Sequence, residues 1–306
     1  MNPDLEAELR DLFRDAGVRG WVHATLVTAD SPRQRQREVG LGAREPVVPA
    51  SVYKLAVLAA FCRAVDAAEV DPTEQVTLHP ADRTAGPTGL SVLADPVTMS
   101  WRDLATSMIT VSDNAAADAV HRRVGQHRVR TLLDELGLST TRINGGTAET
   151  HRDLLRDTHT RDIAEALAVL ADNNAPASTR ALAPVYGSVT TPADMTHLLA
   201  ALWRGDLASP AQTAFARRVL GAQVWPHRLR AGFPATVRVA GKTGTLASLR
   251  NEVGIVTYPD EHPVAVAVFT HAARADTLVP RADAAIAAAA HRAVTALRAP
   301  RLTARS

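Results

Sequence analysis

The segments of this chain that favour strands lie near its two ends, and a long helix-rich block separates them. Near the start, residues 21–28 alternate between apolar and polar side chains, and residues 36–41 follow after a polar turn. Near the end, three β-rich runs occupy 237–241, 253–258 and 264–270. Because a sheet must bury at least one face, we expect both ends to pair in one mixed antiparallel sheet of five strands, flanked by helices.

The middle of the chain carries helical patterns. Residues 51–68 are apolar on nearly all sides, so we expect this helix at the centre of a core. Apolar spacing predicts further helices at 3–16, 101–110, 115–124, 127–136, 161–172, 192–203, 210–220 and 281–298.

These patterns predict one domain over residues 1–306, of the α/β (α+β) class. Its α/β lobe combines 1–48 with 222–306, and residues 49–221 form an inserted all-helical lobe. The least regular segment, 144–191, is predicted to be an extended loop. A long loop of this kind inside a compact domain usually has a function or is an insertion.

Composition and charge argue against several classes of protein. The formal net charge is only +2 and the arginines are spread along the chain, so we expect no nucleic-acid partner. The single cysteine, Cys62, cannot form an intrachain disulfide, and its apolar surroundings favour a core position. The histidines lack the spacing of zinc ligands, so we expect no metal and no cofactor. Those considered are His121, His151, His159 and His197.

The start of the chain does not resemble a secretory signal. Residues 1–15 are rich in acidic side chains and have neither a basic start nor an uninterrupted apolar run. The sequence contains no stretch that is long and apolar enough to span a bilayer. We therefore expect a cytoplasmic protein with no membrane partner.

Lysine is nearly absent from this sequence. Of its 34 basic residues, only Lys54 and Lys242 are lysines. An arginine stays protonated, whereas a lysine amine can become neutral and act as a base. Two lysines can survive by chance in an arginine-rich chain, but the contexts of these two favour a chemical role.

Ser51 and Lys54 form a Ser-x-x-Lys pair at the start of the expected buried helix. If Ser51 opens that helix, the two side chains lie on one face, about one turn apart. A neutral amine beside a serine hydroxyl can take its proton and make it nucleophilic. A capping serine followed by an ordinary lysine is the structural alternative.

Two further motifs follow along the chain. In Ser112–Asn114, a hydroxyl and an amide can pass a proton and anchor a carbonyl, although Ser-Asp-Asn also suits a helix N-terminus. In Lys242–Thr245, a lysine and two threonine hydroxyls can receive a carboxylate. Gly244 is expected to let a substrate backbone approach closely. The alternative is a strand end with a turn glycine.

Taken in this order, Ser-x-x-Lys, Ser-Asp-Asn and Lys-Thr-Gly resemble the motif set of the class A β-lactamases and the related penicillin-binding proteins. The stretch 95–99 is similar as well. The succession of strands, helices and strands also matches that family, so the resemblance covers most of the chain. It implies a β-lactamase-like fold and a serine hydrolase that works through an acyl-enzyme.

The resemblance implies a role for each motif residue. Ser51 attacks a carbonyl carbon, and Lys54 is its base. Ser112 passes a proton to the leaving group, and Asn114 holds an amide carbonyl of the substrate. The backbone N–H groups of Ser51 and Thr245 form the oxyanion hole.

The expected partner is a small-molecule substrate that carries a carboxylate. The residues implied to receive this group are Lys242, Thr243, Thr245 and Arg250, with Gly244 beside them.

The chain departs from the family after residue 140. Class A enzymes carry a glutamate there that activates the water for release of the acyl group. Matching residues 141–143 to the family's similar run puts Thr147 at the glutamate position and His151 at the position of a following asparagine. Glu149 either substitutes as the catalytic base or is a solvated loop carboxylate, and we slightly favour the second.

Three functions follow as hypotheses. The first is an acyl hydrolase that acts on β-lactams or related amides and esters. The second is a cytoplasmic esterase, amidase or acyltransferase with a small biosynthetic substrate. The third is a β-lactam-binding protein that is acylated slowly and does not turn over.

Overall fold

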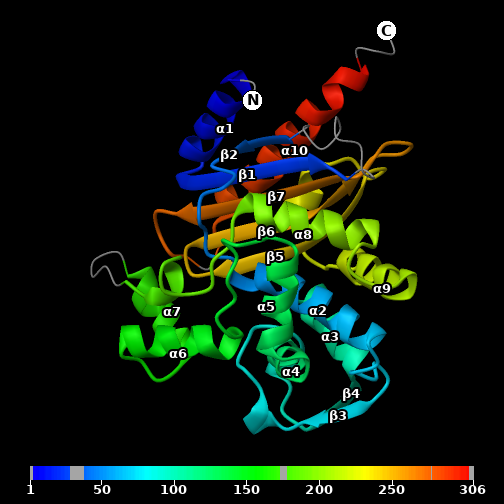
Figure 1. Ribbon diagram of the computed structural model, residues 1–306. Helices are drawn as coiled ribbons and strands as arrows, with labels where there is room; N and C mark the ends of the chain where they lie inside the picture. The colour runs from blue at the N-terminus through cyan, green and yellow to red at the C-terminus, as the bar shows by residue number, and fades with distance from the viewer. Residues whose placement is uncertain (1–2, 28–37, 173–177, 277, 303–306) are drawn as a thin grey trace.

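The computed structural model describes residues 3–27, 38–172, 178–276 and 278–302. Within these ranges, five strands form one antiparallel sheet in the order β2-β1-β7-β6-β5, so strands from both ends of the chain lie side by side (Figure 1). They are β1 (Val18–Leu26), β2 (Glu38–Leu41), β5 (Arg238–Leu246), β6 (Leu249–Thr257) and β7 (Val264–Ala272). The predicted five-stranded antiparallel sheet is confirmed. Residues 28, 36 and 37 of the predicted strands lie outside the described residues.

All nine predicted helices are present, with each end within four residues of its predicted position, and one further helix over 147–158 was not predicted. Those of the outer layer are α1 (Pro3–Asp15) and α10 (Pro280–Leu302). The others are α2 (Lys54–Asp66), α3 (Trp101–Thr110), α4 (Asn114–Val124), α5 (Gln126–Glu135), α6 (Thr147–Thr158), α7 (Ile163–Ala171), α8 (Pro192–Arg204) and α9 (Pro210–Gly221).

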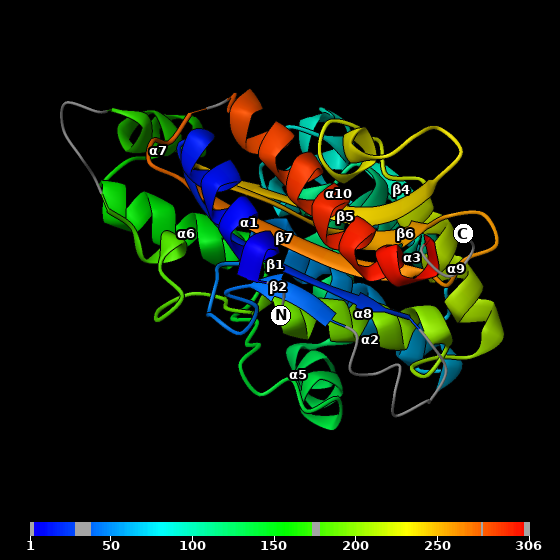
Figure 2. The same cartoon turned by 90° about the horizontal axis from the view of Figure 1, so that it is seen from above.

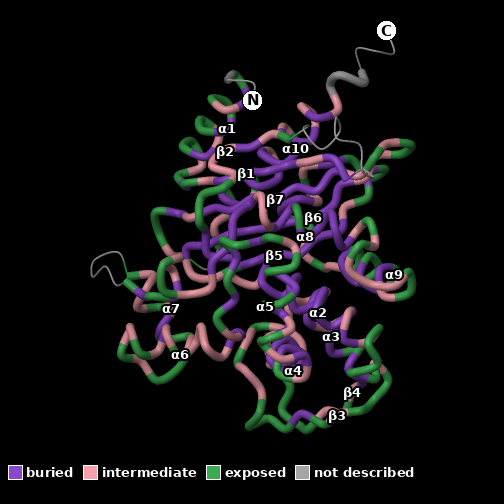
Figure 3. Tube along the Cα trace, viewed as in Figure 1, coloured by how far each residue is buried: buried purple, intermediate pink, exposed green. Residues whose placement is uncertain are grey.

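The central strand β7 explains the layered arrangement. Its alternate residues Val266 and Val268 belong to an apolar core with α1 and α10, and Ala265 and Ala267 belong to a second core with the helical lobe. Successive side chains of a strand point to opposite faces, so a strand that is covered on both sides reads as continuously apolar. Helices α1 and α10 lie together across one face of the sheet (Figure 2). The sheet and α2 are buried along most of their length (Figure 3).

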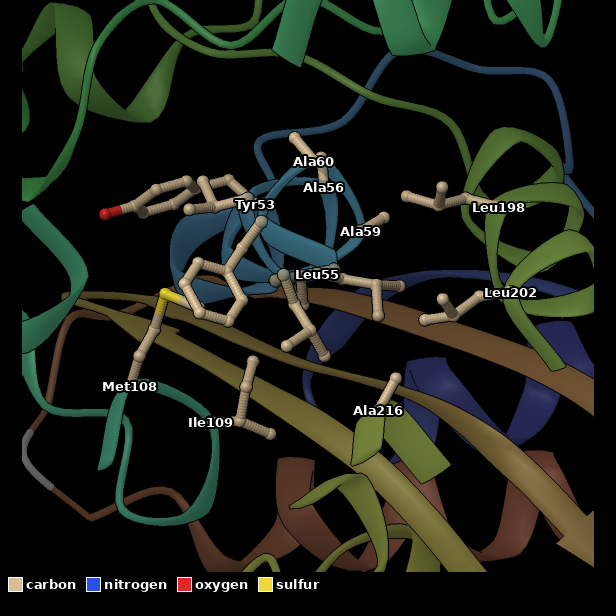
Figure 4. Packing of buried hydrophobic residues seen from close by; sticks show 14 of the residues in the cluster. Tyr53, Leu55, Ala56, Ala59, Ala60, Met108, Ile109, Leu198, Leu202 and Ala216 are labelled. Atoms are coloured by element: carbon tan, nitrogen blue, oxygen red, sulfur yellow. The ribbon is translucent and has the colours of Figure 1, made fainter. Parts of the chain in front are cut away.

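Helix α2 is the buried centre of the helical lobe, as predicted. Cys62 is fully buried within it, in the core position that the sequence favours. Figure 4 shows α2 side chains, among them Leu55, Ala56 and Ala59, in a cluster that also includes neighbours from the surrounding helices. Those neighbours are Met108 and Ile109 of α3, Leu198 and Leu202 of α8, and Ala216 of α9.

Two predictions about the middle of the chain need correction. Residues 49–221 are not entirely helical, because β3 (Gln75–Leu78) and β4 (Val97–Ser100) pair as a separate two-stranded sheet. The segment 144–191 is not one extended loop, because it contains α6 in addition to α7, the helix predicted at 161–172. Helix α6 follows two glycines, and the N–H groups that begin it are bound by a distant carboxylate, which local sequence does not reveal.

Two site motifs also sit differently in their elements than expected. Ser51 does not open the long helix but lies in the short 3-10 turn η1 (Ala50–Tyr53), and Lys54 is the first residue of α2. Residues 242–245 lie inside β5, which continues to Leu246, rather than at the end of a strand. Within the described ranges, we find no helix with the length and apolarity needed to cross a membrane.

The packing of α10 against the turn η5 (Leu229–Gly232) requires a residue without a side chain at Gly232. A Cβ atom at this position would lie 2.5 Å from the Ala287 carbonyl oxygen of α10. Because that contact involves backbone, we expect Gly232→Ala to lower the free energy of unfolding by about 1–3 kcal/mol. Gly221→Ala is the matched control, since a Cβ there meets nothing within 4 Å. It should be neutral or stabilising by up to about 1 kcal/mol. Equal urea midpoints for the two variants would contradict this packing.

Candidate active site

The three motifs meet at one cavity of about 360 Å³ between the helical lobe and the edge strand β5. Its walls include Ser51 from η1, Ser112 and Asn114 from the start of α4, and Thr243 and Thr245 from β5. These elements are far apart in the sequence. The fold therefore brings together the serine hydroxyls, the asparagine amide and the threonine hydroxyls of the three separate motifs.

The backbone around Ser51 is held in an uncommon conformation. Ala50, directly before it, has φ +46°, and Ser112 has φ +61°, both in the left-handed region that non-glycine residues seldom adopt. Such backbone persists only where the surrounding structure fixes it, and it is concentrated at functional sites.

Gly244 explains how η1 can lie so close to β5. A Cβ on Gly244 would come within 2.6 Å of the Pro49 carbonyl oxygen and 3.1 Å of Val52 Cγ2. The glycine thus gives space to the chain around Ser51, whereas we had expected it to make room for a substrate. Asn251 holds the same segment, because its Nδ2 donates to the carbonyls of Val48 and Pro49.

Lys54 lies fully buried behind the cavity, and its amine is surrounded by oxygen acceptors. Nζ donates to the Ser112 carbonyl at 2.7 Å and to Asn114 Oδ1 at 2.9 Å. The Ser112 hydroxyl oxygen lies 3.4 Å from the same nitrogen. Burial lowers the pKa of Lys54 to about 7, against the opposing effect of the Asp118 and Asp113 carboxylates.

Lys242 also contacts the Ser112 hydroxyl. Its Nζ donates to Ser112 Oγ at 2.9 Å and to the Thr243 carbonyl at 2.9 Å, and its side chain is fully buried. Burial and then the positive field of Lys54 hold the pKa of Lys242 well below its usual value. Two buried amines that share one hydroxyl disfavour full protonation of the pair at neutral pH, so a neutral amine is available as a base.

The acid nearest to Lys242 in the core is Glu252 of β6. It is fully buried, and burial raises the pKa of this carboxyl to about 7. Gln223 connects it to the site, since Gln223 Nε2 donates to Glu252 and its Oε1 accepts from the Thr243 N–H. Glu252 therefore supports the strand that carries Lys242 and Thr243.

Asn114 links Lys54 to α6. Its Oδ1 accepts from Lys54, and its Nδ2 donates to the Ala85 carbonyl at 2.9 Å. The Thr147 hydroxyl lies 3.5 Å from Asn114 Oδ1 and 3.0 Å from the Tyr53 hydroxyl. Thr147 thus reaches the site at the position where the resemblance implied a glutamate.

The two carboxylates near the start of α6 differ in position. Asp118 of α4 accepts from the N–H groups of Thr147 and Ala148 and fixes the first turn of α6. Glu149 accepts from the Gly146 N–H at 2.8 Å and pairs with Arg152. Its side chain is outside the set that lines the cavity. This arrangement favours the second of our two interpretations of Glu149, a carboxylate that acts on the loop and not on the acyl group.

Arg228 is a site residue that the sequence did not reveal. Its guanidinium is buried against the cavity wall and donates to Thr245 Oγ1 at 2.9 Å and to the Gly244 carbonyl at 3.1 Å. Asp283 of α10 accepts from its Nε at 2.6 Å. No local signal marks this arginine, because arginine serves as the general cation throughout the chain.

Arg250 was expected to receive a carboxylate and also lines the cavity. Its guanidinium donates to the carbonyls of Ala247, Leu249 and Asp276. These bonds tie the β5–β6 turn to the segment before α10. Its part in carboxylate binding stays a prediction, and Arg228 is better placed beside Thr245.

His151 lies one helical turn after Thr147 and lines the same cavity. Desolvation lowers the pKa of this imidazole, and the positive field of Lys54 acts in the same direction against that of Asp118. For metals, the described part of the chain contains no group of three or more histidine, cysteine or acidic residues that could hold an ion.

Comparison with known proteins gives the same assignment as the motifs and the fold. The chain is 29% identical over 302 residues to the β-lactamase regulatory protein BlaB of Streptomyces cacaoi, which covers 93% of this chain and 95% of that protein. Among solved structures, a variant of the last common ancestor of Gram-negative class A β-lactamases is 26% identical, with a TM-score of 0.74 and coverage of 95% and 97%. PBP-A shares the fold at 19% identity, with a TM-score of 0.76 and 97% of both chains covered.

The model of the β-lactamase enzyme family matches residues 4–297, which is nearly the whole chain. This protein therefore belongs to the β-lactamase enzyme family.

Proposed function

We propose that this protein is a serine acyl hydrolase of the class A type, which is acylated at Ser51 by β-lactams or by related amides and esters. The observation that carries the proposal is the Ser112 hydroxyl between two buried lysine amines, in the wall of the cavity that contains Ser51. A serine hydroxyl becomes nucleophilic when a neutral base is within reach, and burial supplies such a base here.

In the proposed acylation step, Lys54 accepts the proton of the Ser51 hydroxyl while Ser51 Oγ bonds to the substrate's carbonyl carbon. The backbone N–H groups of Ser51 and Thr245 stabilise the resulting oxyanion, and one such donor is typically worth about 2.7–4 kcal/mol. When the bond to the leaving atom breaks, Ser112 donates its proton to that atom and regains one from Lys54. Both amines finish in the state in which they began.

The substrate is proposed to carry a carboxylate. Lys242, Thr243 and Thr245 offer donors along one strand, and Arg228 adds a fixed positive charge beside Thr245. Asn114 holds a substrate amide in this proposal. The esterase, amidase or acyltransferase alternative uses the same residues on a different acyl group, and its cytoplasmic location also stays a prediction.

A second candidate function is a β-lactam-binding protein that releases its acyl group slowly. Thr147, which has no basic group, stands where the family carries the glutamate that activates water. The similarity to a protein named as a β-lactamase regulator also favours a role in sensing over rapid hydrolysis. Measurement of the acyl-enzyme over time separates the two candidates.

The first prediction concerns Ser51. Incubation with a chromogenic cephalosporin should add the mass of one ring-opened molecule to the protein, and Ser51→Ala should add none, because the attacking oxygen is absent. Ser209→Ala, which removes a remote helix-capping hydroxyl, is the matched control and should still be labelled. Intact-mass spectrometry reads the adduct, and absorbance reads turnover. Absence of an adduct with every β-lactam tested would redirect the search to esters and amides.

A second prediction follows from the lowered pKa of Lys54. The neutral amine is the active form, so the acylation rate should rise with pH up to about 7 and level off above it. Well below that value it should fall about tenfold per pH unit. Lys54→Arg should lower the rate at least about 100-fold, because arginine stays protonated. Arg63→Lys, a basic exchange farther along α2, should leave it unchanged. If the acylation rate stays constant between about pH 5 and about pH 9, Lys54 is excluded as the base.

A third prediction concerns release of the acyl group. Thr147→Glu should place a carboxylate near Asn114 and speed deacylation by about 100-fold, the usual scale of a positioned general base. Thr147→Gln has a similar size without the charge and should stay slow. The decay of the acyl-enzyme, followed by mass after removal of free substrate, gives both rates. Equal decay in the two variants would show that a base at this position does not limit release.

A further inference from the structure

We propose that His151 is the general base that activates the molecule accepting the acyl group from Ser51. The proposal rests on the acylation of Ser51 proposed above. It places the base for release of the acyl group on α6, where the sequence had indicated only Glu149 as a candidate.

His151 and Thr147 are four residues apart in α6, so they lie on the same face of the helix. The direction of that face is fixed by Thr147, whose hydroxyl lies 3.5 Å from Asn114 Oδ1, the atom that also accepts from Lys54. Both residues line the cavity that contains Ser51. The imidazole therefore opens onto the same space as the nucleophile and its lysine.

The acidic residues of α6 nearest to His151 are less suited to this task. Glu149 is outside the cavity wall and is bound by the Gly146 N–H and Arg152. Asp153 does line the cavity, but its carboxylate accepts from Arg156 at 2.6 Å. Each of these two carboxylates is therefore already paired with an arginine. By contrast, the ring of His151 makes no hydrogen bond to any residue in the described ranges.

The electrostatic surroundings of His151 support a base in its neutral form. Desolvation and then Lys54 lower the pKa of the imidazole, and Asp118 opposes them. A half-buried imidazole with two free nitrogens and a lowered pKa can accept a proton at neutral pH.

The step balances as follows when water is the acceptor. Water oxygen bonds to the carbonyl carbon of the Ser51 ester, and its proton passes to His151. The bond from that carbon to Ser51 Oγ then breaks, and the imidazolium returns the proton to Ser51 Oγ. The products are a carboxylic acid, free Ser51 and neutral His151.

The experiment compares acylation and release separately in the full chain. His151→Asn and His151→Gln are labelled with a chromogenic cephalosporin, freed of excess reagent and followed by intact mass. We expect both variants to form the adduct at close to the parent rate and to release it at least about tenfold more slowly. His197→Asn is the matched control, because this exposed histidine of α8 also has a lowered pKa but lies outside the cavity wall. Its release rate should equal that of the parent.

The outcomes are distinguishable. Unchanged release in both His151 variants would overturn the assignment while leaving acylation of Ser51 in place. Loss of the adduct in these variants alone would also overturn it, because His151 would then serve the first step. Slower release in Glu149→Gln with parent-like release in His151→Gln would transfer the role to Glu149. If the parent itself forms no adduct, the proposed function fails first and the assignment of His151 fails with it.

Discussion

The Ser112 hydroxyl lies between two buried lysine amines, one supplied by each lobe, and the rest of the site depends on this contact. Lys54 begins α2 and Lys242 lies inside β5, so the two amines meet only where the helical lobe packs against the sheet edge. A single buried ammonium costs free energy, and a second one beside it costs more. Burial therefore lowers the pKa of both amines, and the field of Lys54 lowers that of Lys242 further, which favours the neutral amine that our proposal requires.

Small residues allow the two lobes to approach this closely. Gly244 gives space to the Pro49 carbonyl and to Val52, and so η1 can lie against β5. Asn251 on the neighbouring strand binds the carbonyls of the same segment. The uncommon backbone at Ala50 and Ser112 is held from both sides by such contacts. The position of the nucleophile is thus set by backbone packing between lobes more than by the helix that follows it.

Short-range patterns predicted the parts of this structure that depend on local sequence. Alternation and apolar runs predicted the five strands and the buried α2, and the motif order predicted the residues around Ser51. The sequence patterns did not predict the features that depend on contacts between residues far apart in the chain. Helix α6 begins where Asp118 accepts from the N–H groups of Thr147 and Ala148, about 30 residues away. Arg228 is fixed by Asp283 and Thr245, and nothing near it in the chain marks it among so many arginines.

The same remote contact connects α6 to the residues of the proposed acylation step. Asp118 fixes the first turn of α6, and its carboxylate also acts on the pKa values of Lys54 and His151. One buried carboxylate therefore holds the helix that faces the acyl group and opposes the lowering of both pKa values. A change in α6 that removed the two N–H donors of Asp118 would be expected to affect both proposed steps. The substitution of a threonine at the family's glutamate position preserves those donors, because they are backbone groups. In our proposal, a different chemistry of release is thus compatible with an unchanged Asp118 contact and with Lys54 as the base.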